Sequence, residues 1–351
     1  MAKLTANTYV GDDGWAGRNF IVTHAPVTEA EVHLELDPNF MSKEPTPVAI
    51  EEVKCEGGKV YITPAYFKYG GGWTLTVGAD RYTQEDVDDQ QVEGLDAFAA
   101  KKEGDVLYRL YSPKTKQARP LILFLHGGGE SGFDNLKQMV GTIGAIHLQE
   151  MYPDFYIMAP QAPALHDFNM MVGKATKQSF ATSDIKGKHG WHREYLAAVC
   201  DIIRAMIDEG KVDMNRVYVT GMSMGGGGTL RAMSVGAGLF AAAAPICPTM
   251  TPETYGILCG LVNEKIWIST AYVDHTIYRH KYIVDGIMAL RDAGNNNAHL
   301  TLYSPEELEA YGLATDPDMP LQAKFGANHA SWILTYHNEY NILSWLTEQT
   351  L

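Results

Sequence analysis

The chain contains the stretch Arg216-Val-Tyr-Val-Thr-Gly-Met-Ser-Met-Gly-Gly-Gly-Gly228. Its first half is apolar enough to form a buried strand, and Gly-x-Ser-x-Gly follows that strand directly. A serine hydroxyl is a weak nucleophile, so an enzyme that uses one presents it at a strained turn beside a base and oxyanion donors. The flanking glycines permit the turn because side chains there would collide as the backbone folds back. The stretch therefore predicts a strand, an exposed Ser223 and a helix beginning near Thr229.

From about residue 105 onward, apolar strands alternate with amphipathic helices. An uninterrupted apolar run is typical of a strand that is buried on both faces of a parallel sheet. The alternation predicts an α/β fold with a doubly wound, mostly parallel sheet over residues 101–351. The expected strands are 106–111, 120–125, 156–161, 216–221, 241–247, 265–270 and 299–303, and the expected helices are 194–209, 278–293 and 336–346.

Residues 1–100 have a different pattern, with short and partly alternating apolar runs separated by Gly, Pro, Asn and Asp. This spacing predicts a small all-β sandwich. Tyr66, Phe67, Tyr69 and Trp73 are interpreted as its aromatic core, and the acidic segment 82–92 as a solvated linker or turn. No cluster of catalytic residue types occurs here, so packing or oligomerisation is the expected role, with substrate or carbohydrate binding as the alternatives.

Composition excludes several classes of protein. The formal charge of −14 argues against nucleic acid and anionic membranes as partners, since both require a basic surface. The longest apolar run, residues 235–246, is too short to span a membrane. The N-terminus lacks the apolar core of a signal peptide, so we expect a cytoplasmic protein, or a secreted one whose signal peptide has been removed.

The four cysteines show neither CxxC spacing nor a metal-ligand pattern. We expect free thiols and no metal site, with a Cys247–Cys259 disulfide as the alternative.

The strand expected at 120–125 ends in His126-Gly-Gly-Gly-Glu130. Glycines at such a strand end leave backbone N–H groups free to bind an oxyanion. Gly128 and Gly129, together with the N–H of Met224 after the serine, are the predicted oxyanion hole.

An exposed serine needs a base, and the base needs an acid to orient it. In this type of sheet the order along the chain is Ser, then Asp or Glu, then His, each after a strand. Asp274 follows the strand 265–270, and His329 lies in a glycine-containing loop near the chain end, so both are predicted to complete a triad with Ser223. The competing candidates are Glu306, Glu307, Asp316 and Asp318 for the acid, and His275 and His337 for the base.

Together these residues resemble the α/β-hydrolase esterases, in particular the group of polyhydroxybutyrate depolymerases and feruloyl esterases. The resemblance covers residues from about 105 to 351. It rests on His126–Glu130, Ala159–Gln161, Asn215–Gly226, Asp274 and His329–Trp332. It implies an α/β-hydrolase fold, and the sandwich ahead of it is similar to the immunoglobulin-like domain of some bacterial esterases. Glu130, Gln161 and Trp332 in these segments are candidate substrate contacts.

Residues 162–192 form a long irregular segment between predicted elements, which is where function often lies. We interpret it as one wall of a substrate pocket. Trp191 is its candidate aromatic contact, and the alternative is that Trp191 anchors the segment to the core.

The predicted function is that of a serine carboxylesterase that hydrolyses small or aryl esters through an acyl-enzyme, without a metal or organic cofactor. Its partner is a small-molecule ester, and the sandwich edges offer a route to a homo-oligomer. Two alternatives share the fold. A serine peptidase of the prolyl-oligopeptidase type would need a propeller domain, which residues 1–100 are too few to form. A non-catalytic binding protein would not need a complete triad.

Overall fold

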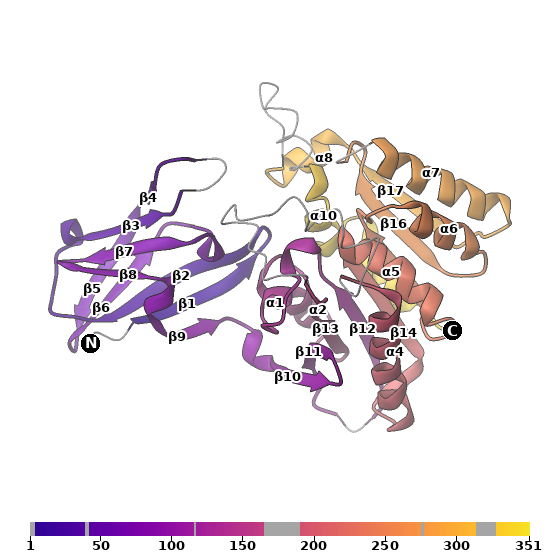
Figure 1. The fold of residues 1–351 in the computed structure, drawn as a ribbon, viewed down its shortest axis with the longest axis horizontal. Coiled ribbons are helices and arrows are strands. Elements are labelled where there is room, and N and C mark those ends of the chain that lie inside the picture. The colour runs from indigo at the N-terminus through magenta and orange to yellow at the C-terminus, as the bar shows by residue number, and fades with distance from the viewer. Residues whose placement is uncertain (1–3, 39–41, 116, 165–189, 275–276, 314–327) are drawn as a thin grey trace. The chain divides into compact units, whose positions relative to one another are not determined.

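The computed structural model describes residues 4–38, 42–115, 117–164, 190–274, 277–313 and 328–351. The chain forms two compact units. One extends through Ala97 and includes Val140–Ile143, and the other comprises the rest of the described chain. Each is drawn in Figure 1 with its elements labelled.

The first unit is an all-β sandwich of a five-stranded and a four-stranded sheet. The five-stranded sheet has the order β5 (Ile50–Glu56), β6 (Lys59–Pro64), β2 (Gly14–Thr23), β1 (Leu4–Gly11) and β9 (Val87–Val92). The four-stranded sheet has the order β4 (Thr46–Val48), β3 (Val32–Leu36), β7 (Trp73–Val77) and β8 (Asp80–Thr83). Alternate side chains of the strands fill the core between the sheets, as the sequence pattern predicted.

Two details of this unit were predicted wrongly. The segment 82–92 contains a short 3-10 turn (η3, Gln84–Asp86), but the rest of it is not a linker or turn, because β9 pairs with β1 in parallel and completes the larger sheet. The strand is polar, and its pairing depends on a strand far away in the sequence. Phe67, Tyr69 and Trp73 are buried in the core as expected, but the Tyr66 side chain is 55% exposed and its hydroxyl donates to Asp13.

The second unit contains an eight-stranded sheet. Its order is β10 (Phe98–Glu103), β11 (Val106–Tyr111), β13 (Tyr156–Pro160), β12 (Arg119–Leu125), β14 (Val212–Met222), β15 (Ala242–Ile246), β16 (Ile266–Ala271) and β17 (Ala298–Tyr303). The strands from β13 to β17 are parallel, whereas β10 and β11 are antiparallel additions at one edge. This is the predicted doubly wound, mostly parallel sheet.

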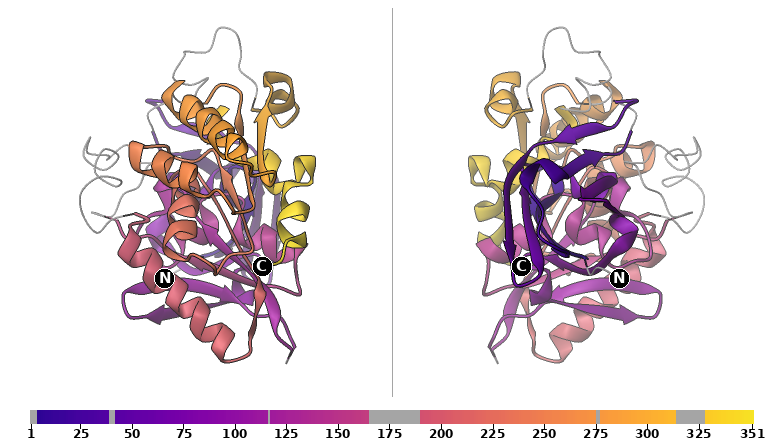
Figure 2. Two further views of the ribbon diagram at one scale, coloured as in Figure 1. Left: turned by 90° about the vertical axis from the view of Figure 1, so that its right-hand side faces the viewer. Right: turned by 90° about the vertical axis from the view of Figure 1, so that its left-hand side faces the viewer.

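Helices cover both faces of this sheet, as Figure 2 shows. Leu121, Leu123 and Leu125 of β12 join the core on one side, under the helices α4 to α7. Phe124 points to the other face and meets the ring of Tyr336 in α10. The continuous apolar run of β12 is thus buried on both faces. The helices are α1 (Lys137–Val140), α2 (Ala145–Met151), α4 (Arg193–Asp208), α5 (Met224–Val235), α6 (Pro252–Gly260), α7 (Ile277–Asp292), α8 (Pro305–Ala310), α10 (Trp332–Tyr336) and α11 (Ile342–Glu348).

The helix predicted at 336–346 is interrupted. Helix α10 ends at Tyr336, and Asn338, Tyr340 and Asn341 adopt positive φ angles before α11 begins at Ile342. Asparagine tolerates this left-handed conformation better than most residues, so the break is encoded locally.

Two further findings bear on the sequence predictions. All four cysteines are free, which excludes a Cys247–Cys259 disulfide in this structure. None of the described helices is long and apolar enough to cross a membrane.

Helix α5 begins at Met224, directly after the serine, and not near Thr229 as predicted. The glycine run lies inside the first turns of the helix, although glycine is a poor helix former. Packing explains it: a Cβ built on Gly225 would lie 1.9 Å from the carbonyl oxygen of Leu125, and one on Gly226 would lie 2.5 Å from that of Ile246. Only glycine allows α5 to approach the ends of β12 and β15 this closely.

The substitution Gly225→Ala should therefore lower the free energy of unfolding by about 3 kcal/mol, because the added methyl group meets backbone that cannot move aside. Gly256→Ala is the matched control: Gly256 lies on the exposed side of α6 with no atom within 4 Å of the new Cβ. Gly256→Ala should raise the free energy of unfolding by about 0.5–1 kcal/mol. Urea denaturation of the two variants measures both values, and equal stabilities would contradict the close approach.

Candidate active site

Ser223 lies in the tight turn between β14 and α5, with φ of 57° and ψ of −115°. This backbone conformation is unfavourable for a residue with a side chain and persists only where the surroundings impose it. Three backbone hydrogen bonds do so. The N–H of Ser223 donates to Ile246 O (3.0 Å), and its carbonyl accepts from the N–H groups of Gly227 (3.1 Å) and Thr249 (2.8 Å).

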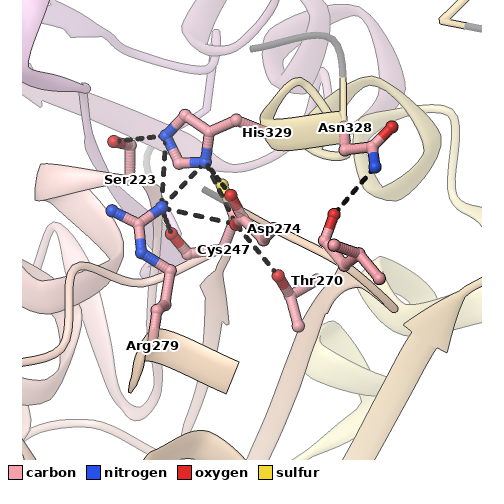
Figure 3. Close-up of polar contacts among 8 residues, drawn as sticks. Ser223, Cys247, Thr270, Asp274, Arg279, Asn328 and His329 are labelled. Carbon is pink, nitrogen blue, oxygen red and sulfur yellow. Dashed lines mark hydrogen bonds and ion pairs between the residues drawn. The ribbon is translucent and has the colours of Figure 1, made fainter. Parts of the chain in front are cut away.

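The structure brings Ser223, His329 and Asp274 into one chain of hydrogen bonds (Figure 3). The Oγ of Ser223 lies 2.8 Å from Nε2 of His329. On the other side of the imidazole, Nδ1 lies 2.9 Å from Oδ1 and 3.1 Å from Oδ2 of Asp274. The three residues come from the ends of different elements: the turn after β14, the loop after β16 and the segment before α10.

Asp274 is held ionised inside the protein, with a side chain only 1% exposed. Burial by itself would raise its pKa, but the hydrogen bond and charge of His329, and then the charge of Arg279, lower the pKa to about 2. Thr270 Oγ1 donates a further hydrogen bond to Oδ2 at 3.2 Å. These partners keep the acid oriented toward the imidazole.

The glycine loop after β12 lies beside the serine. A Cβ on Gly127 would be 3.8 Å from the Cβ of Ser223. Gly128 and Gly129 follow in a 3-10 turn (η5, Gly128–Glu130). Met224 is the first residue of α5, so its N–H has no acceptor within the helix. The predicted oxyanion donors therefore belong to the two segments that flank Ser223.

His126 holds this loop in place. Its Nε2 accepts a hydrogen bond from the N–H of Ala162 (2.8 Å), so Nδ1 carries the proton and donates to Gly127 O (2.6 Å). The indole of Trp191 donates to His126 O at 3.0 Å. Trp191 is only 1% exposed and packs against the His126 ring, which favours the interpretation of Trp191 as an anchor; its contact with substrate stays a prediction.

Gln161 and Glu130 lie behind the same loop. The Gln161 amide nitrogen donates to Glu130 O (3.1 Å) and Asp134 Oδ1 (2.9 Å), and its oxygen accepts from Asn135 N (2.6 Å). Glu130 is 6% exposed, and its Oε2 faces Gly127. In this structure Gln161 braces the loop, and the role of both residues in substrate binding stays a prediction.

Trp332 packs edge-on against the His329 ring, with 5.5 Å between the ring centroids. It is the first residue of α10, three residues after His329, which lies at the end of a preceding helical segment and not in the predicted loop. Its contact fixes the plane of the imidazole.

The competing acids and bases lie elsewhere or outside the described residues. Glu306 and Glu307 are in the first turn of α8, where the Glu307 side chain accepts from Ser304 N in a capping box. His337 is the C-cap of α10 and packs against His147. Asp316, Asp318 and His275 fall outside the described residues, as do residues 165–189 of the proposed pocket wall.

Three residues of the site were not identified from sequence. Arg279 contacts both Asp274 and His329, Thr270 contacts Asp274, and Asn328 donates from Nδ2 to Val273 O (2.8 Å). Asn328 thereby ties the segment that carries His329 to the loop that carries Asp274. The positions of two of them in the sequence could have identified them. Thr270 ends the strand predicted before Asp274, and Arg279 lies five residues after Asp274, at the start of the next helix.

One described group of side chains has the residue types of a metal site. Ligand atoms of Cys247, Asp274 and His329 lie within 4.8 Å of one another. Asp274 and His329 already pair with each other, and the Arg279 guanidinium beside them opposes a second cation. The arrangement suits proton transfer between Ser223 and His329 better than metal binding.

No family model and no curated protein matches the sequence. Among solved structures, a thermostable esterase is similar over 99% of this chain and 100% of its own, with a TM-score of 0.66 and 22% identity. An S-formylglutathione hydrolase from Staphylococcus aureus has a TM-score of 0.44 and 12% identity, covering 72% of this chain and 96% of its own. An esterase from Thermogutta terrifontis has a TM-score of 0.42 and 14% identity, covering 73% of this chain and 94% of its own. The first likeness confirms the predicted fold, an α/β-hydrolase sheet preceded by a β-sandwich.

Stability at acid pH should depend on Asp274. Its pKa is about 2 in the folded protein against an ordinary 3.8, so its ionised form stabilises the fold above that ordinary value and the contribution disappears as pH falls toward 2. The shift corresponds to about 2 kcal/mol. The difference in free energy of unfolding between the wild type and Asp274→Asn should shrink by about that amount between about pH 5 and about pH 2. Urea denaturation across this range measures it, and a constant difference would contradict the assignment.

Proposed function

We propose that this protein is a serine carboxylesterase that hydrolyses small or aryl carboxylic esters through a covalent acyl-enzyme. The observation that carries the proposal is the continuous chain from Ser223 Oγ through His329 to the buried Asp274. Every distance in it is within hydrogen-bonding range, and the serine lies on a strained turn beside the glycine loop and the first N–H of α5.

In the acylation half, Nε2 of His329 takes the Ser223 proton while Oγ forms a bond to the ester carbonyl carbon. The Asp274 carboxylate orients the imidazole and stabilises the imidazolium that forms. The carbonyl oxygen becomes an oxyanion, to which the N–H groups of Met224 and of Gly128 or Gly129 would donate. His329 then gives its proton to the alcohol oxygen as the carbon–oxygen bond breaks and the alcohol leaves.

In the deacylation half, His329 takes a proton from water, and the water oxygen attacks the acyl carbon. The bond to Ser223 Oγ breaks, and Oγ regains its proton from His329. The net reaction consumes one ester and one water and yields one acid and one alcohol, with the enzyme unchanged. None of these steps requires a metal or an organic cofactor.

The contacts of the candidate triad do not discriminate between acyl groups. The resemblance to polyhydroxybutyrate depolymerases and feruloyl esterases suggests esters of hydroxy acids and hydroxycinnamates as the first to assay. An arylamide substrate tested beside the matching aryl ester separates the esterase from a peptidase of the prolyl-oligopeptidase type.

We further propose residues 101–351 as the catalytic domain and residues 1–100 as an immunoglobulin-like module without catalytic residues. The candidate site draws only on residues that follow β12. Edge strands of the sandwich would be the route to a homo-oligomer.

Ser223→Ala should lower kcat for para-nitrophenyl acetate by about 10⁶-fold, because no other group can form the acyl-enzyme. Ser234→Ala is the matched control, since Ser234 lies on the same helix and its hydroxyl only accepts from Arg193. A fluorophosphonate probe should label the wild type and the control and leave Ser223→Ala unlabelled. Labelling of the Ser223→Ala variant, or no labelling of the wild type, would sink the proposal and favour a non-catalytic binding protein.

A further inference from the structure

Arg279 occupies the centre of the site, although no step of the proposed hydrolysis uses it. Its Nη1 lies 2.8 Å from Nδ1 and 3.4 Å from Nε2 of His329, and 3.3 Å from Oδ2 of Asp274. The same nitrogen reaches Cys247 O at 3.4 Å. The side chain is 12% exposed, and Figure 3 shows its guanidinium directed between Ser223 and Asp274.

The contact with His329 conflicts with the role of a base. Nδ1 has one in-plane position, and both Arg279 Nη1 and the Asp274 carboxylate approach it. A guanidinium can only donate, so its bond to Nδ1 requires the tautomer whose proton is on Nε2. That tautomer cannot take the Ser223 proton, whereas the productive one donates from Nδ1 to Asp274.

The charge of Arg279 acts in the same direction. Among the residues that the structure describes, the titratable or charged groups beside the imidazole include Asp274 after β16, Arg279 on α7 and the Cys247 thiol after β15, with the Ser223 hydroxyl at the start of α5. Among these, Arg279 is the cation, and it opposes formation of the imidazolium. A cation in the first turn of a helix is also unfavourable for the helix itself. Stability of α7 therefore does not account for this residue.

We propose that Arg279 is a specificity-determining residue that selects esters carrying a carboxylate close to the scissile bond. A substrate carboxylate would accept charge-assisted hydrogen bonds from the guanidinium, which is shaped for such pairing. It would draw Arg279 away from Nδ1, return Nδ1 to Asp274 and offset the positive charge beside the imidazole. The substrate carboxylate would therefore have two effects: it would strengthen substrate binding, and it would free His329 from Arg279 so that the imidazole can act as the base. This inference rests on the proposed esterase function.

The preference is measured with two matched substrate pairs. Para-nitrophenyl hydrogen adipate and its methyl ester differ in charge on the acyl side, and para-carboxyphenyl acetate and its methyl ester differ on the alcohol side. In at least one pair the anionic member should have a kcat/KM about 10- to 100-fold higher, the range expected for a hydrogen bond to a charged group. The gain should appear in kcat as well as in KM, because the base is released.

Substitution of the arginine tests its role. Arg279→Met should abolish the preference and move the acid limb of the pH profile for neutral esters to higher pH, because the imidazolium then forms more easily. Arg279→Lys should retain part of the preference, since it keeps the charge without the planar fork. Arg291→Met is the matched control on the same helix: Arg291 Nε donates to Ala298 O, remote from the site, and its loss should leave the preference unchanged.

A measurement on the unmodified protein covers the case in which Arg279→Met does not fold. Adipate should inhibit hydrolysis of a neutral ester competitively, and neutral adipamide at the same concentration should not. Equal kcat/KM within both substrate pairs, or equal inhibition by the two compounds, would overturn the inference. An enzyme that is labelled by fluorophosphonate but shows no such preference leaves the esterase proposal standing, whereas absence of labelling removes both.

Discussion

The close approach of helix α5 to the ends of β12 and β15 is the contact on which the rest of the site depends. Gly225 lets the first turn of the helix rest against the carbonyl of Leu125, and the chain must then reverse within one residue, Ser223. The positive φ of Ser223 is the conformational cost of that reversal, and three backbone hydrogen bonds hold it. The same contact brings Gly127 beside the serine, so one packing constraint positions both the hydroxyl and the glycine loop.

The positions of Asp274 and His329 depend on electrostatics and not on backbone packing. A buried carboxylate is stable only if its charge is compensated, and Asp274 has His329, Arg279 and Thr270 around it. Thr270 and Arg279 lie within five residues of Asp274 in the sequence, whereas His329 comes from a segment more than 50 residues later. Asn328 adds a direct tie between the segment that carries His329 and the loop that carries Asp274. The geometry of the imidazole is thus held by side chains from β16, the loop after it and α7, in addition to its own segment.

Most of the α/β sheet could be predicted because its strands are continuous apolar runs, and a run such as 120–125 can be buried only between two layers of helices. The candidate triad was accessible for a related reason: Ser223 and Asp274 follow strand ends, and the three residue types occur in the order expected for this type of sheet. The elements that the local sequence pattern did not predict are those that depend on tertiary contacts. Strand β9 is polar and pairs with β1 more than 80 residues earlier, at positions such as Leu4 and Val87. The glycine-rich start of α5 has poor helix propensity, and only its fit against Leu125 makes it helical.

Arg279 illustrates a second kind of information that sequence pattern does not carry. A backbone turn or a glycine loop is visible in sequence because it restricts which residues are tolerated there. A long, flexible arginine on a helix is compatible with almost any surface position, so nothing in its neighbourhood marks it as part of a site. Its role follows from the 2.8 Å between its Nη1 and Nδ1 of His329, a distance that depends on how α7 packs against α6 and β17. The reaction type that we propose rests on backbone geometry, which sequence motifs report. The selectivity that we propose rests on a side chain whose placement only the folded structure reveals.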